Sequence, residues 1–505
     1  MCVLQRENEI YLPLLRIERR GKKLTQQRFN FLFNPKFSLS LGLSGIALFL
    51  LSLYNRIMHI DDAWLGEYAY WNFKIGHVKS ELFRGFEGYE NQIYVCHKFF
   101  LMQGSWLIQH FGFDLYVLKS LSLIYIIALL PFIYLYLKEN VSKKLRTSYF
   151  LIFIALLFTN PIFFEYGFVF RPEINVMTLG FISFFLIDIG LNKKNILLIC
   201  ISGIISGISV LTHLNSIIFI VSGLVIILLE RKYFYFLIYG LISACISLFY
   251  FMDIHSSIDY NQMVHQFIND PALDKEKFIW YTYILNILKE HERFFHSPKE
   301  IFFSVLLFLV ISLNFRFIWN QHRRIFLYSI SLVLMLAIIA HGKTSKYSLI
   351  YLPFLCLLIV IGLGQQILMQ YKLNWVFPFI FIYFIGSSVL NVQMLSWKKK
   401  SDSSHNAMLA KNIPLGSKVL APMQFVFNEL NNYQIQGLHC YRFFEKRKQF
   451  GNTPFNVFQV AEYFSNEYII FDEEYIQHYN LTSGKIYGSY KPISIKKEWI
   501  YKKFR

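Results

Sequence analysis

Charged residues are scarce in this sequence. Only 16% of its 505 residues carry a charge, whereas 55% are hydrophobic and the mean hydropathy is +0.39. The charges cluster between long apolar runs, although a globular protein would scatter them over its surface. Apolar runs of about 18 residues are long enough to cross the hydrocarbon core of a bilayer as helices. The composition therefore excludes a soluble protein and predicts a membrane protein.

Cysteine gives no sign of a disulfide framework or of a metal centre. The six cysteines form no CxxC pair and show no metal-ligand spacing. Three of them lie in apolar runs, where cysteine behaves as a small hydrophobic residue. A cleavable signal peptide is also missing, because the first apolar run starts near Phe37, after a long basic tail. We expect that run to remain in the protein as a helix.

The net charge of +18 is explained by the position of the basic residues. Nucleic acid is not an expected partner, because no basic-aromatic surface module is present. The early basic residues instead lie in short loops, at Arg16, Arg19, Arg20, Lys22, Lys23, Lys143, Lys144, Arg146, Lys193, Lys194, Arg231, Lys232, Arg323 and Arg324. Such loops on alternate sides predict a cytoplasmic N-terminus, with membrane lipids as partners. The predicted location is the inner (plasma) membrane.

The apolar runs predict an α-helical polytopic membrane protein with about eleven transmembrane helices. They lie near residues 37–54, 114–137, 147–163, 174–191, 196–212, 214–229, 233–252, 300–319, 325–340, 347–367 and 375–395. Residues 1–36 form a basic cytoplasmic tail and residues 37–396 the transmembrane domain. Residues 397–505 are expected to be a soluble α/β domain on the outer, periplasmic or extracellular face. The strand-like segments KVLAP, YIIFDE and PISIKKEWIYKKF and the helix-like NVFQVAEYF support this reading.

Two further outer segments are too long to be turns. Residues 55–113 contain two amphipathic stretches, of which the first carries aromatic residues at helical spacing that suit the bilayer interface. This stripe consists of Trp64, Tyr68, Trp71 and Ile75. Residues 253–299 form a long polar loop with a helix expected around residues 276–293.

Asp61 and Asp62 are adjacent carboxylates just beyond the outer end of the first predicted helix. At the membrane surface, such an acid can meet both a lipid-linked molecule and a molecule from the water side, and it can act as a general base on a hydroxyl. The alternative is helix capping, because Asp favours helix starts and residues 63–73 look helical. The two roles are compatible if one carboxylate caps the helix and the other acts chemically.

Three cations lie where local preference disfavours them. Arg171, in Phe-Arg-Pro-Glu, begins a helix whose positive N-terminal dipole repels it, which suggests an anionic partner. Lys343 and Lys346 lie in an outer loop, against the positive-inside rule, and lysine can hold phosphate. The alternatives are a snorkelling arginine paired with Glu173 or Glu165, and lysines that contact lipid headgroups.

Histidines and acids near the outer face are candidates for a donor or acceptor site. They are Glu87, Glu90, His97, His213 and His255. These residues are also candidate ligands for a divalent metal, although no ligand pair such as HExxH is present. Ordinary polar loop residues are the alternative reading.

In their order and their shared outer face, four segments resemble the GT-C superfamily of membrane glycosyltransferases. The resemblance is to the branch of the protein O-mannosyltransferases and the lipid A aminoarabinose transferases. The segments are DDAWLGEYAYWNF at 61–73, FRPE at 170–173, LTHLNSIIFI at 211–220 and KTSKYSLIYLPFLCLL at 343–358. The match covers roughly residues 37–396. It departs from the branch at Asp62, where many relatives have Glu, and at residues 79–98, which lack a Pro-rich run.

The resemblance implies that the chain moves a sugar from a polyprenyl-phosphate donor to a hydroxyl of a lipid, glycan or protein acceptor, with inversion. Asp61 would be the general base, and Asp62 would orient it or bind the acceptor. The donor phosphate would lie on Arg171, Lys343, Lys346 and Tyr347. The alternatives are a glycan polymerase or ligase, and a non-enzymatic polyprenyl-lipid flippase or transporter. A transporter favours inverted repeats and broken helices, which the sequence does not show.

Overall fold

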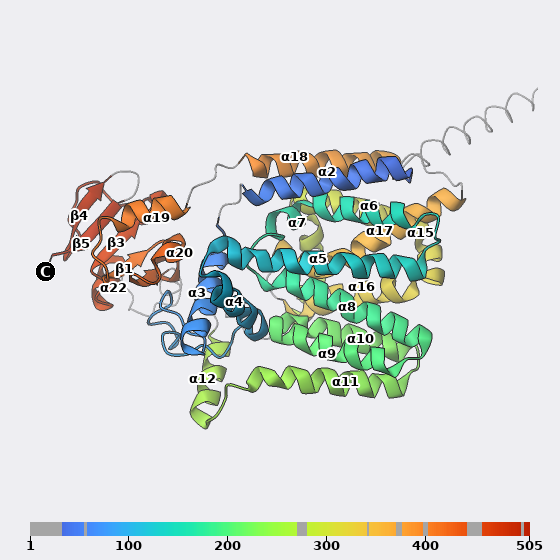
Figure 1. The fold of residues 1–505 in the computed structure, drawn as a ribbon, viewed down its shortest axis with the longest axis horizontal. Coiled ribbons are helices and arrows are strands. Elements are labelled where there is room, and N and C mark those ends of the chain that lie inside the picture. Colours follow the sequence, from blue (N-terminus) through green and yellow to red (C-terminus); the bar gives the residue numbers. More distant parts are fainter. Residues whose placement is uncertain are drawn as a thin grey trace, which may run out of the picture.

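The computed structural model describes residues 33–54, 58–269, 280–340, 343–369, 376–396, 402–441, 457–495 and 499–504. In these residues a bundle of long, roughly parallel helices carries a smaller α/β region at one end (Figure 1). Most of the predicted basic tail, residues 1–32, lies outside the described residues.

Each of the predicted transmembrane segments coincides with a helix of the bundle. The helices are α2 (Pro35–Tyr54), α5 (Leu115–Asn140), α6 (Arg146–Thr159), α8 (Pro172–Lys193), α9 (Ile196–Thr212), α10 (Ile217–Leu229), α11 (Tyr233–Ser247), α15 (Pro298–Gln321), α16 (Arg323–Ile339), α17 (Leu352–Met369) and α18 (Val376–Leu395). In the described part of the chain, seven helices are long and apolar enough to cross a membrane, whereas α6, α9 and α10 are shorter. The chain is therefore a multi-pass membrane protein, and the number of eleven crossings stays a prediction.

Small residues let α8, α9 and α11 approach one another closely. A Cβ atom at Gly207 of α9 would lie 2.5 Å from the Cβ of Ile246 on α11, so only glycine fits there. The Ser183 hydroxyl of α8 lies 2.8 Å from that of Ser202 and 2.6 Å from that of Ser206, both on α9. Close backbone approach and hydrogen bonds between helices replace the hydrophobic effect, which is weak between helices in lipid.

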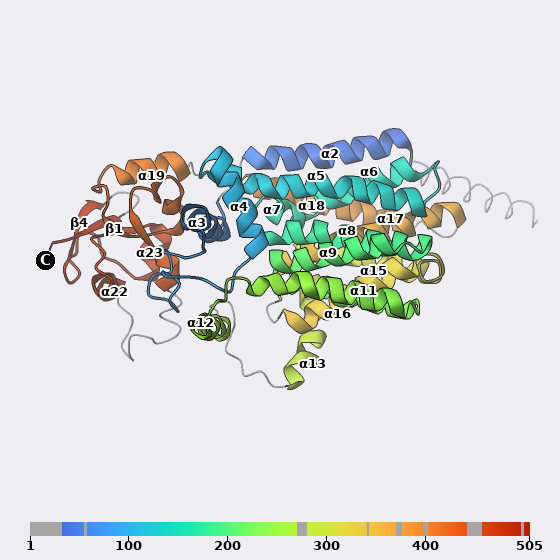
Figure 2. The same cartoon turned by 60° about the horizontal axis from the view of Figure 1, so that its bottom comes forward.

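Shorter helices connect the bundle. They are α3 (Ile60–Ile75), α4 (Lys98–Phe111), α7 (Pro161–Tyr166), α12 (Ser257–Ile268), α13 (Trp280–Leu288) and α14 (Glu292–Phe295), with the 3-10 turns η1 (Leu214–Ser216), η2 (Leu248–Phe251), η3 (Lys289–His291) and η4 (Ser345–Tyr351). Of these, α3, α4 and α12 lie at the end of the bundle that carries the α/β region (Figures 1 and 2). The helix predicted around residues 276–293 corresponds to α13–α14, and residues 270–279 lie outside the described part.

The aromatic stripe of α3 was expected at the bilayer interface, but most of it is covered by protein. Tyr68 is buried and the Trp64 ring lies 5.6 Å from that of Phe83 in a tilted contact, while Ile75, which is 44% exposed, is the one exposed member of the stripe. A Cβ at Gly66 would lie within 3.1 Å of both Leu118 of the bundle and a phenylalanine of the α/β region. The helix is thus buried between the two parts of the chain, a contact that helical periodicity alone does not reveal.

The α/β region contains one five-stranded sheet in the order β2-β1-β3-β5-β4. Its strands are β1 (Lys418–Ala421), β2 (Gln434–Gly437), β3 (Tyr468–Phe471), β4 (Tyr490–Ile495) and β5 (Trp499–Lys503), and its helices are α19 (Asp402–Ala410), α20 (Val426–Glu429), α22 (Val457–Tyr463) and α23 (Glu473–His478), with the 3-10 turn η6 (Met423–Phe425). The first three strands are parallel and the last two antiparallel. The expected α/β fold is confirmed, and β2 is the strand that the sequence did not reveal.

Strand β2 joins the sheet to the first outer loop. The Gly437 backbone N–H donates to the Leu82 carbonyl at 3.0 Å, and the Gln436 amide donates to the Arg84 carbonyl at 2.9 Å. One hydrophobic core also runs from α3 and this loop into the sheet. The end of the bundle that carries Asp61 is therefore packed against the C-terminal region.

Candidate functional site

The start of α3 is built by a capping box. The Nδ1 of His59, the N-cap residue, accepts from the Asp61 backbone N–H at 3.2 Å, and the His59 backbone N–H donates to the Asp62 carboxylate at 2.7 Å. His59 is therefore the N-cap, and Asp62, at the third helical position, completes the capping box. The acid pair was expected to supply the N-cap itself, whereas Asp62 supports the helix start from inside the first turn.

Asp62 also ties α3 to the Phe-Arg-Pro-Glu segment. Its second oxygen accepts from the Phe170 backbone N–H at 2.7 Å, and the Lys119 ammonium lies 3.1 Å from the carboxylate, with both side chains fully buried. Every oxygen of Asp62 thus has a protein partner, which suits a positioning role. Sequence reasoning missed Lys119, although a lone lysine inside an apolar run signals a buried acidic partner.

Asp61 contacts the Phe-Arg-Pro-Glu segment and lies close to the lysine loop at residues 343–347. Its carboxylate contacts the Arg171 guanidinium directly, and the Lys346 ammonium lies 4.0 Å from the same oxygen. Asp61 is 8% exposed, so this contact is largely shielded from water. Segments that are far apart in the sequence thus bring one acid and two cations together at one end of the bundle. The sequence did not predict this convergence, which the structure shows for Asp61, Arg171 and Lys346.

Arg171 is held between two carboxylates. Its Nε donates to Glu173 at 3.0 Å, and a second nitrogen contacts the same carboxylate. Burial alone would lower the pKa of Arg171, but the neighbouring Glu173 outweighs burial and raises the pKa. The guanidinium therefore stays charged. The predicted alternative of an Arg171–Glu173 pair is present, and it coexists with the contact to Asp61.

Two neutral imidazoles lie beside this cluster. His97 and His213 stack with ring centroids 4.6 Å apart, and His213 lies edge-on to Tyr347 at 6.0 Å. Burial lowers the pKa of His97 to about 4 and that of His213 to about 3. The His213 Nδ1 accepts from the Asn215 backbone N–H at 3.0 Å, so its Nε2 carries the proton. This nitrogen is a hydrogen-bond donor at neutral pH.

Lys343 has a different environment from Lys346. Its ammonium donates to Glu290 at 2.8 Å and to the Ala337 carbonyl at 3.2 Å. Arg293, which is also buried, lies 3.0 Å from the same Glu290 carboxylate and 5.9 Å from the Tyr347 ring. Glu290 thus neutralises the positive charge of Lys343, which was predicted to bind the donor phosphate. The sequence did not reveal Glu290 and Arg293, because their loop shows no motif.

The remaining candidates lie in other contacts. Glu87 pairs with His265, Glu90 accepts from the Gly85 backbone N–H at 3.2 Å, and the His255 backbone N–H donates to Asp259 at 3.0 Å. In the residues that the structure describes, no group of three or more His, Cys, Asp or Glu side chains has a geometry for a metal ion. Their roles toward a donor, an acceptor or a metal stay predictions.

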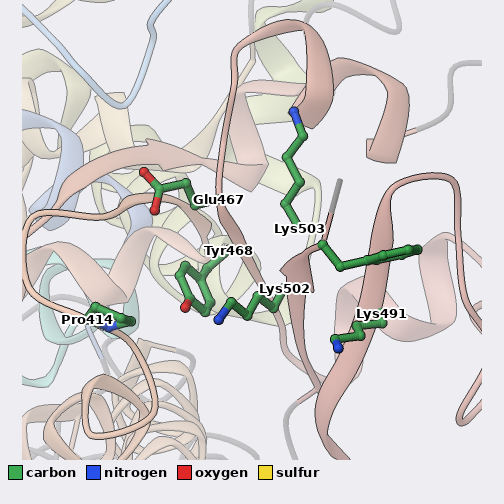
Figure 3. A pocket seen from close by; sticks show the side chains of 7 residues that line it. Pro414, Glu467, Tyr468, Lys491, Lys502 and Lys503 are labelled. Carbon is green, nitrogen blue, oxygen red and sulfur yellow. The ribbon is translucent and has the colours of Figure 1, made fainter.

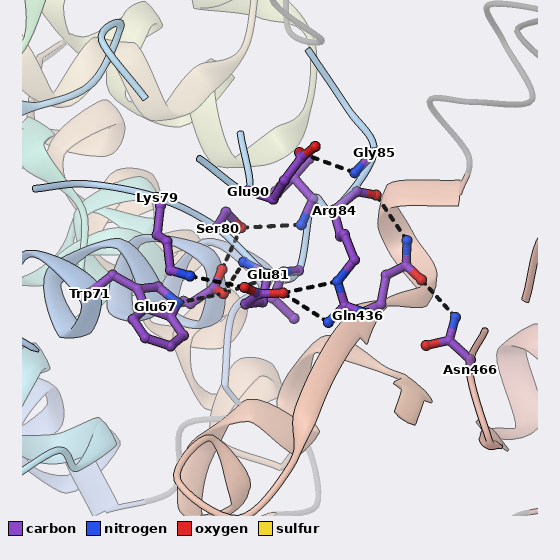
Figure 4. Close-up of polar contacts among 12 residues, drawn as sticks. Glu67, Trp71, Lys79, Ser80, Glu81, Arg84, Gly85, Glu90, Gln436 and Asn466 are labelled. Atoms are coloured by element: carbon purple, nitrogen blue, oxygen red, sulfur yellow. Dashed lines mark hydrogen bonds and ion pairs between the residues drawn. The ribbon is translucent and has the colours of Figure 1, made fainter. Parts of the chain in front are cut away.

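Glu67 lies where α3 meets the first outer loop. Its carboxylate accepts from the Trp71 indole at 3.0 Å, from the Glu81 and Leu82 backbone N–H groups at 2.7 and 3.1 Å, and from the Ser80 hydroxyl at 2.5 Å (Figure 4). Complete burial raises the pKa of Glu67 to about 7, although these hydrogen bonds lower it. A buried carboxyl that can titrate thus holds, by hydrogen bonds, the loop that contacts β2.

We expect Glu67→Gln to change the pH dependence of stability. A carboxyl whose pKa is raised on folding binds its proton more tightly in the folded protein than in the unfolded chain. Its contribution to the free energy of unfolding is therefore complete below about pH 4.5 and is lost as the pH rises to about 7. The loss is about 3 kcal/mol for a shift of about two and a half pKa units. The temperature of thermal unfolding, measured in detergent, should fall less steeply from about pH 5 to about pH 8 in Glu67→Gln than in the wild type.

Glu81→Gln is the matched control for this measurement. Burial raises the pKa of Glu81, but Arg84 and Lys79 outweigh burial and lower it, so Glu81 stays charged over the same range. This variant should keep the pH slope of the wild type. An unchanged slope in Glu67→Gln would show that Glu67 does not titrate with folding.

Comparison with known proteins reveals a shared fold at very low sequence identity. No family model matches the chain, and no curated protein matches it. ArnT from Cupriavidus metallidurans is similar in the apo state (TM-score 0.61) and bound to undecaprenyl phosphate (TM-score 0.58), each at 10% identity over 92% of this chain and 97% or 98% of that chain. Archaeal oligosaccharyltransferase AglB from Archaeoglobus fulgidus, in complex with an inhibitory peptide and a dolichol-phosphate, has a TM-score of 0.53 at 10% identity over 88% of this chain and 70% of that chain. Both are GT-C proteins, so the predicted GT-C fold is confirmed.

Proposed function

We propose that the protein is a glycosyltransferase that moves a sugar from a polyprenyl-phosphate donor to an acceptor hydroxyl, at the end of the bundle that carries the α/β region. The observation that carries this proposal is the largely shielded cluster of Asp61, Arg171 and Lys346. In the proposal, the acid of this cluster serves the acceptor and its two cations serve the donor phosphate. The two similar proteins with bound polyprenyl phosphates, undecaprenyl phosphate and dolichol-phosphate, support this class of donor.

In the proposed reaction, Asp61 takes the proton of the acceptor hydroxyl. The acceptor oxygen forms a bond to the anomeric carbon while the bond from that carbon to the phosphate oxygen breaks, with inversion. The polyprenyl phosphate leaves with the electron pair, and Arg171 and Lys346 stabilise the negative charge that develops on it. Preorganised cations in a water-poor site are effective because they need no reorganisation during the reaction.

The contact between Arg171 and Asp61 fits a donor-first order of binding. Arg171 joins Asp61 and Glu173, so part of the basicity of Asp61 is masked by the guanidinium. A donor phosphate that takes up Arg171 would leave the Asp61 carboxylate to accept a proton. Glu173 would keep the guanidinium in place during this exchange.

A flippase or transporter is the alternative from another class. It would move the polyprenyl lipid without breaking the bond between sugar and phosphate, and it would have no need for a general base. A glycan polymerase or ligase would use the same chemistry and differ only in the acceptor. The acid beside the two cations favours transfer chemistry over transport.

We expect purified protein to consume a polyprenyl-phosphate sugar when an acceptor hydroxyl is supplied. Mass spectrometry of a panel of such donors, incubated with membrane extracts as the acceptor source, should show free polyprenyl phosphate and a glycosylated product in equal amounts. Asp61→Asn protein is the control for contaminating activity. If donors instead cross the bilayer of proteoliposomes intact, the transporter reading replaces the proposal.

A further inference from the structure

A hollow of about 640 Å³ opens on the C-terminal sheet (Figure 3), and none of its lining residues belongs to the candidate transfer site. It lies over the half of the sheet that β3, β5 and β4 form. The residues that line it include Glu467, Tyr468, Lys491, Lys502, Lys503 and Phe504. Cationic and aromatic side chains therefore share one concave surface.

Strand register places like charges side by side in this hollow. Lys491 of β4 pairs directly with Lys502 of β5, and Lys502 pairs with Tyr468 of β3, so the three side chains leave the same face of the sheet. Directly opposite like charges destabilise a strand pair. An anion bound between Lys491 and Lys502 would relieve this repulsion.

In the described part of the chain, the lysines of the hollow have no acidic ion-pair partner. Within the described ranges, no carboxylate forms an ion pair with Lys491 or Lys502, so this face of the hollow carries two positive charges. Lys503 follows Lys502 and Glu467 precedes Tyr468 by one residue, and the side chains of Lys503 and Glu467 point to the opposite face. The Lys502 ammonium lies 5.8 Å from the Tyr468 ring centroid, and the Lys491 ammonium lies 6.0 Å from that of Phe504. Phe504 is 39% exposed, so its ring presents an apolar face beside the cations.

We propose that this hollow binds an anionic saccharide, carboxylated or phosphorylated, and thereby holds the acceptor of the transfer reaction. Ammonium groups suit the anionic substituent as point charges. The exposed Phe504 ring suits the apolar face of a sugar ring. The role as acceptor site rests on the proposed function, whereas saccharide binding itself does not.

The position of the hollow determines the size of the ligand. Strand β2 contacts the first outer loop, and β4 is the opposite edge of the sheet. Neighbouring strands lie about 4.8 Å apart, so roughly 19 Å of sheet separates the two edges. A ligand in the hollow must therefore be a chain of several sugars if its other end is to reach Asp61. Lipid headgroups do not fit this position, because the sheet stands beyond the end of the bundle (Figures 1 and 2).

Binding of defined oligosaccharides to the full-length protein in detergent tests the proposal. The probes are malto-oligosaccharide, the same oligosaccharide phosphorylated, oligogalacturonate and an oligoglutamate of similar charge. At least one anionic saccharide should bind, with an affinity that falls as salt rises, and uncharged malto-oligosaccharide should bind at least about tenfold more weakly. Because the lysines are exposed, Lys491→Gln and Lys502→Gln should each weaken binding about two- to fivefold.

Lys485→Gln is the matched control, because Lys485 is an exposed lysine over an aromatic ring, 5.4 Å from Tyr487, outside the hollow. It should leave binding unchanged, and so should Asp61→Asn, which separates saccharide binding from transfer. An equal loss in Lys485→Gln, or oligoglutamate binding as tight as that of the saccharides, would reduce the hollow to a non-specific basic surface. No binding of either anionic saccharide would also overturn the proposal. Unchanged thermal unfolding shows that the variants are folded.

Discussion

Asp61→Asn is expected to abolish sugar transfer while the protein stays folded and still binds the polyprenyl-phosphate donor. The amide keeps the shape of the carboxylate but cannot take a proton from the acceptor hydroxyl. General-base catalysis contributes about a hundredfold to ten thousandfold in rate, so turnover should fall by at least about a hundredfold. Single-turnover transfer and donor binding, measured on the same preparation, separate the two effects.

Stability should be little affected by this change. Arg171 keeps Glu173 as a partner when Asp61 is neutralised, so no buried cation is left without an acid. Donor binding should stay equal or become tighter, because Arg171 is then released from one of its two carboxylates. Turnover near the wild-type value would remove Asp61 from the role of base.

Asp62→Asn is the matched control, and it should lower stability more than it lowers transfer. Asp62 pairs with Lys119, and both side chains are fully buried. Removing one partner of a buried pair costs about 3–5 kcal/mol, because the other charge is left without compensation. The variant should unfold at lower temperature and keep residual transfer, and adding Lys119→Met should restore part of the stability. Equal losses of rate and stability in both variants would show that the acid pair acts as one structural unit.

The helices and the individual candidate residues were predictable because both depend on strong local signals. A long apolar run specifies a membrane helix by its length alone, and each such run is a helix in the structure. Arg171 and Lys346 stood out because each contradicts a local electrostatic preference. Such contradictions are expected where function, rather than local stability, selects the residue.

The partners of these residues were not predictable from the sequence. Lys119 reaches Asp62 across 57 positions of the chain, and Glu290 reaches Lys343 across 53. Such pairs depend on how the helices pack together, and the hydrophobic periodicity of the sequence does not predict that packing. The burial of α3 under the C-terminal region has the same origin, because a helix pattern shows which face is apolar but not what covers it.

The two cations at Asp61, Arg171 and Lys346, should matter more for turnover than for donor affinity. A leaving polyprenyl phosphate gains negative charge in the transition state, where these cations can stabilise it. Loss of one charge-assisted contact costs about 1.5–3 kcal/mol, which corresponds to roughly a tenfold to hundredfold loss in rate. We expect Lys346→Ala and Arg171→Ala to lower turnover by this amount, and Lys346→Arg to recover part of it. Steady-state rates and donor-binding measurements provide both quantities.

Lys343→Ala is the control that the structure supplies. Its ammonium already pairs with Glu290 at 2.8 Å, so its removal should cost turnover less than the loss of Lys346. Arg171→Ala leaves Glu173 buried without its cation and can lower stability by itself, so the decisive comparison is between Lys346→Ala and Lys343→Ala. Lys346 is partly exposed, with 25% of its side chain accessible, and its truncation leaves no buried acid unpaired because Arg171 remains on Asp61. If Lys346→Ala turns over as fast as Lys343→Ala, with donor bound equally well, the cation pair does not stabilise a leaving phosphate.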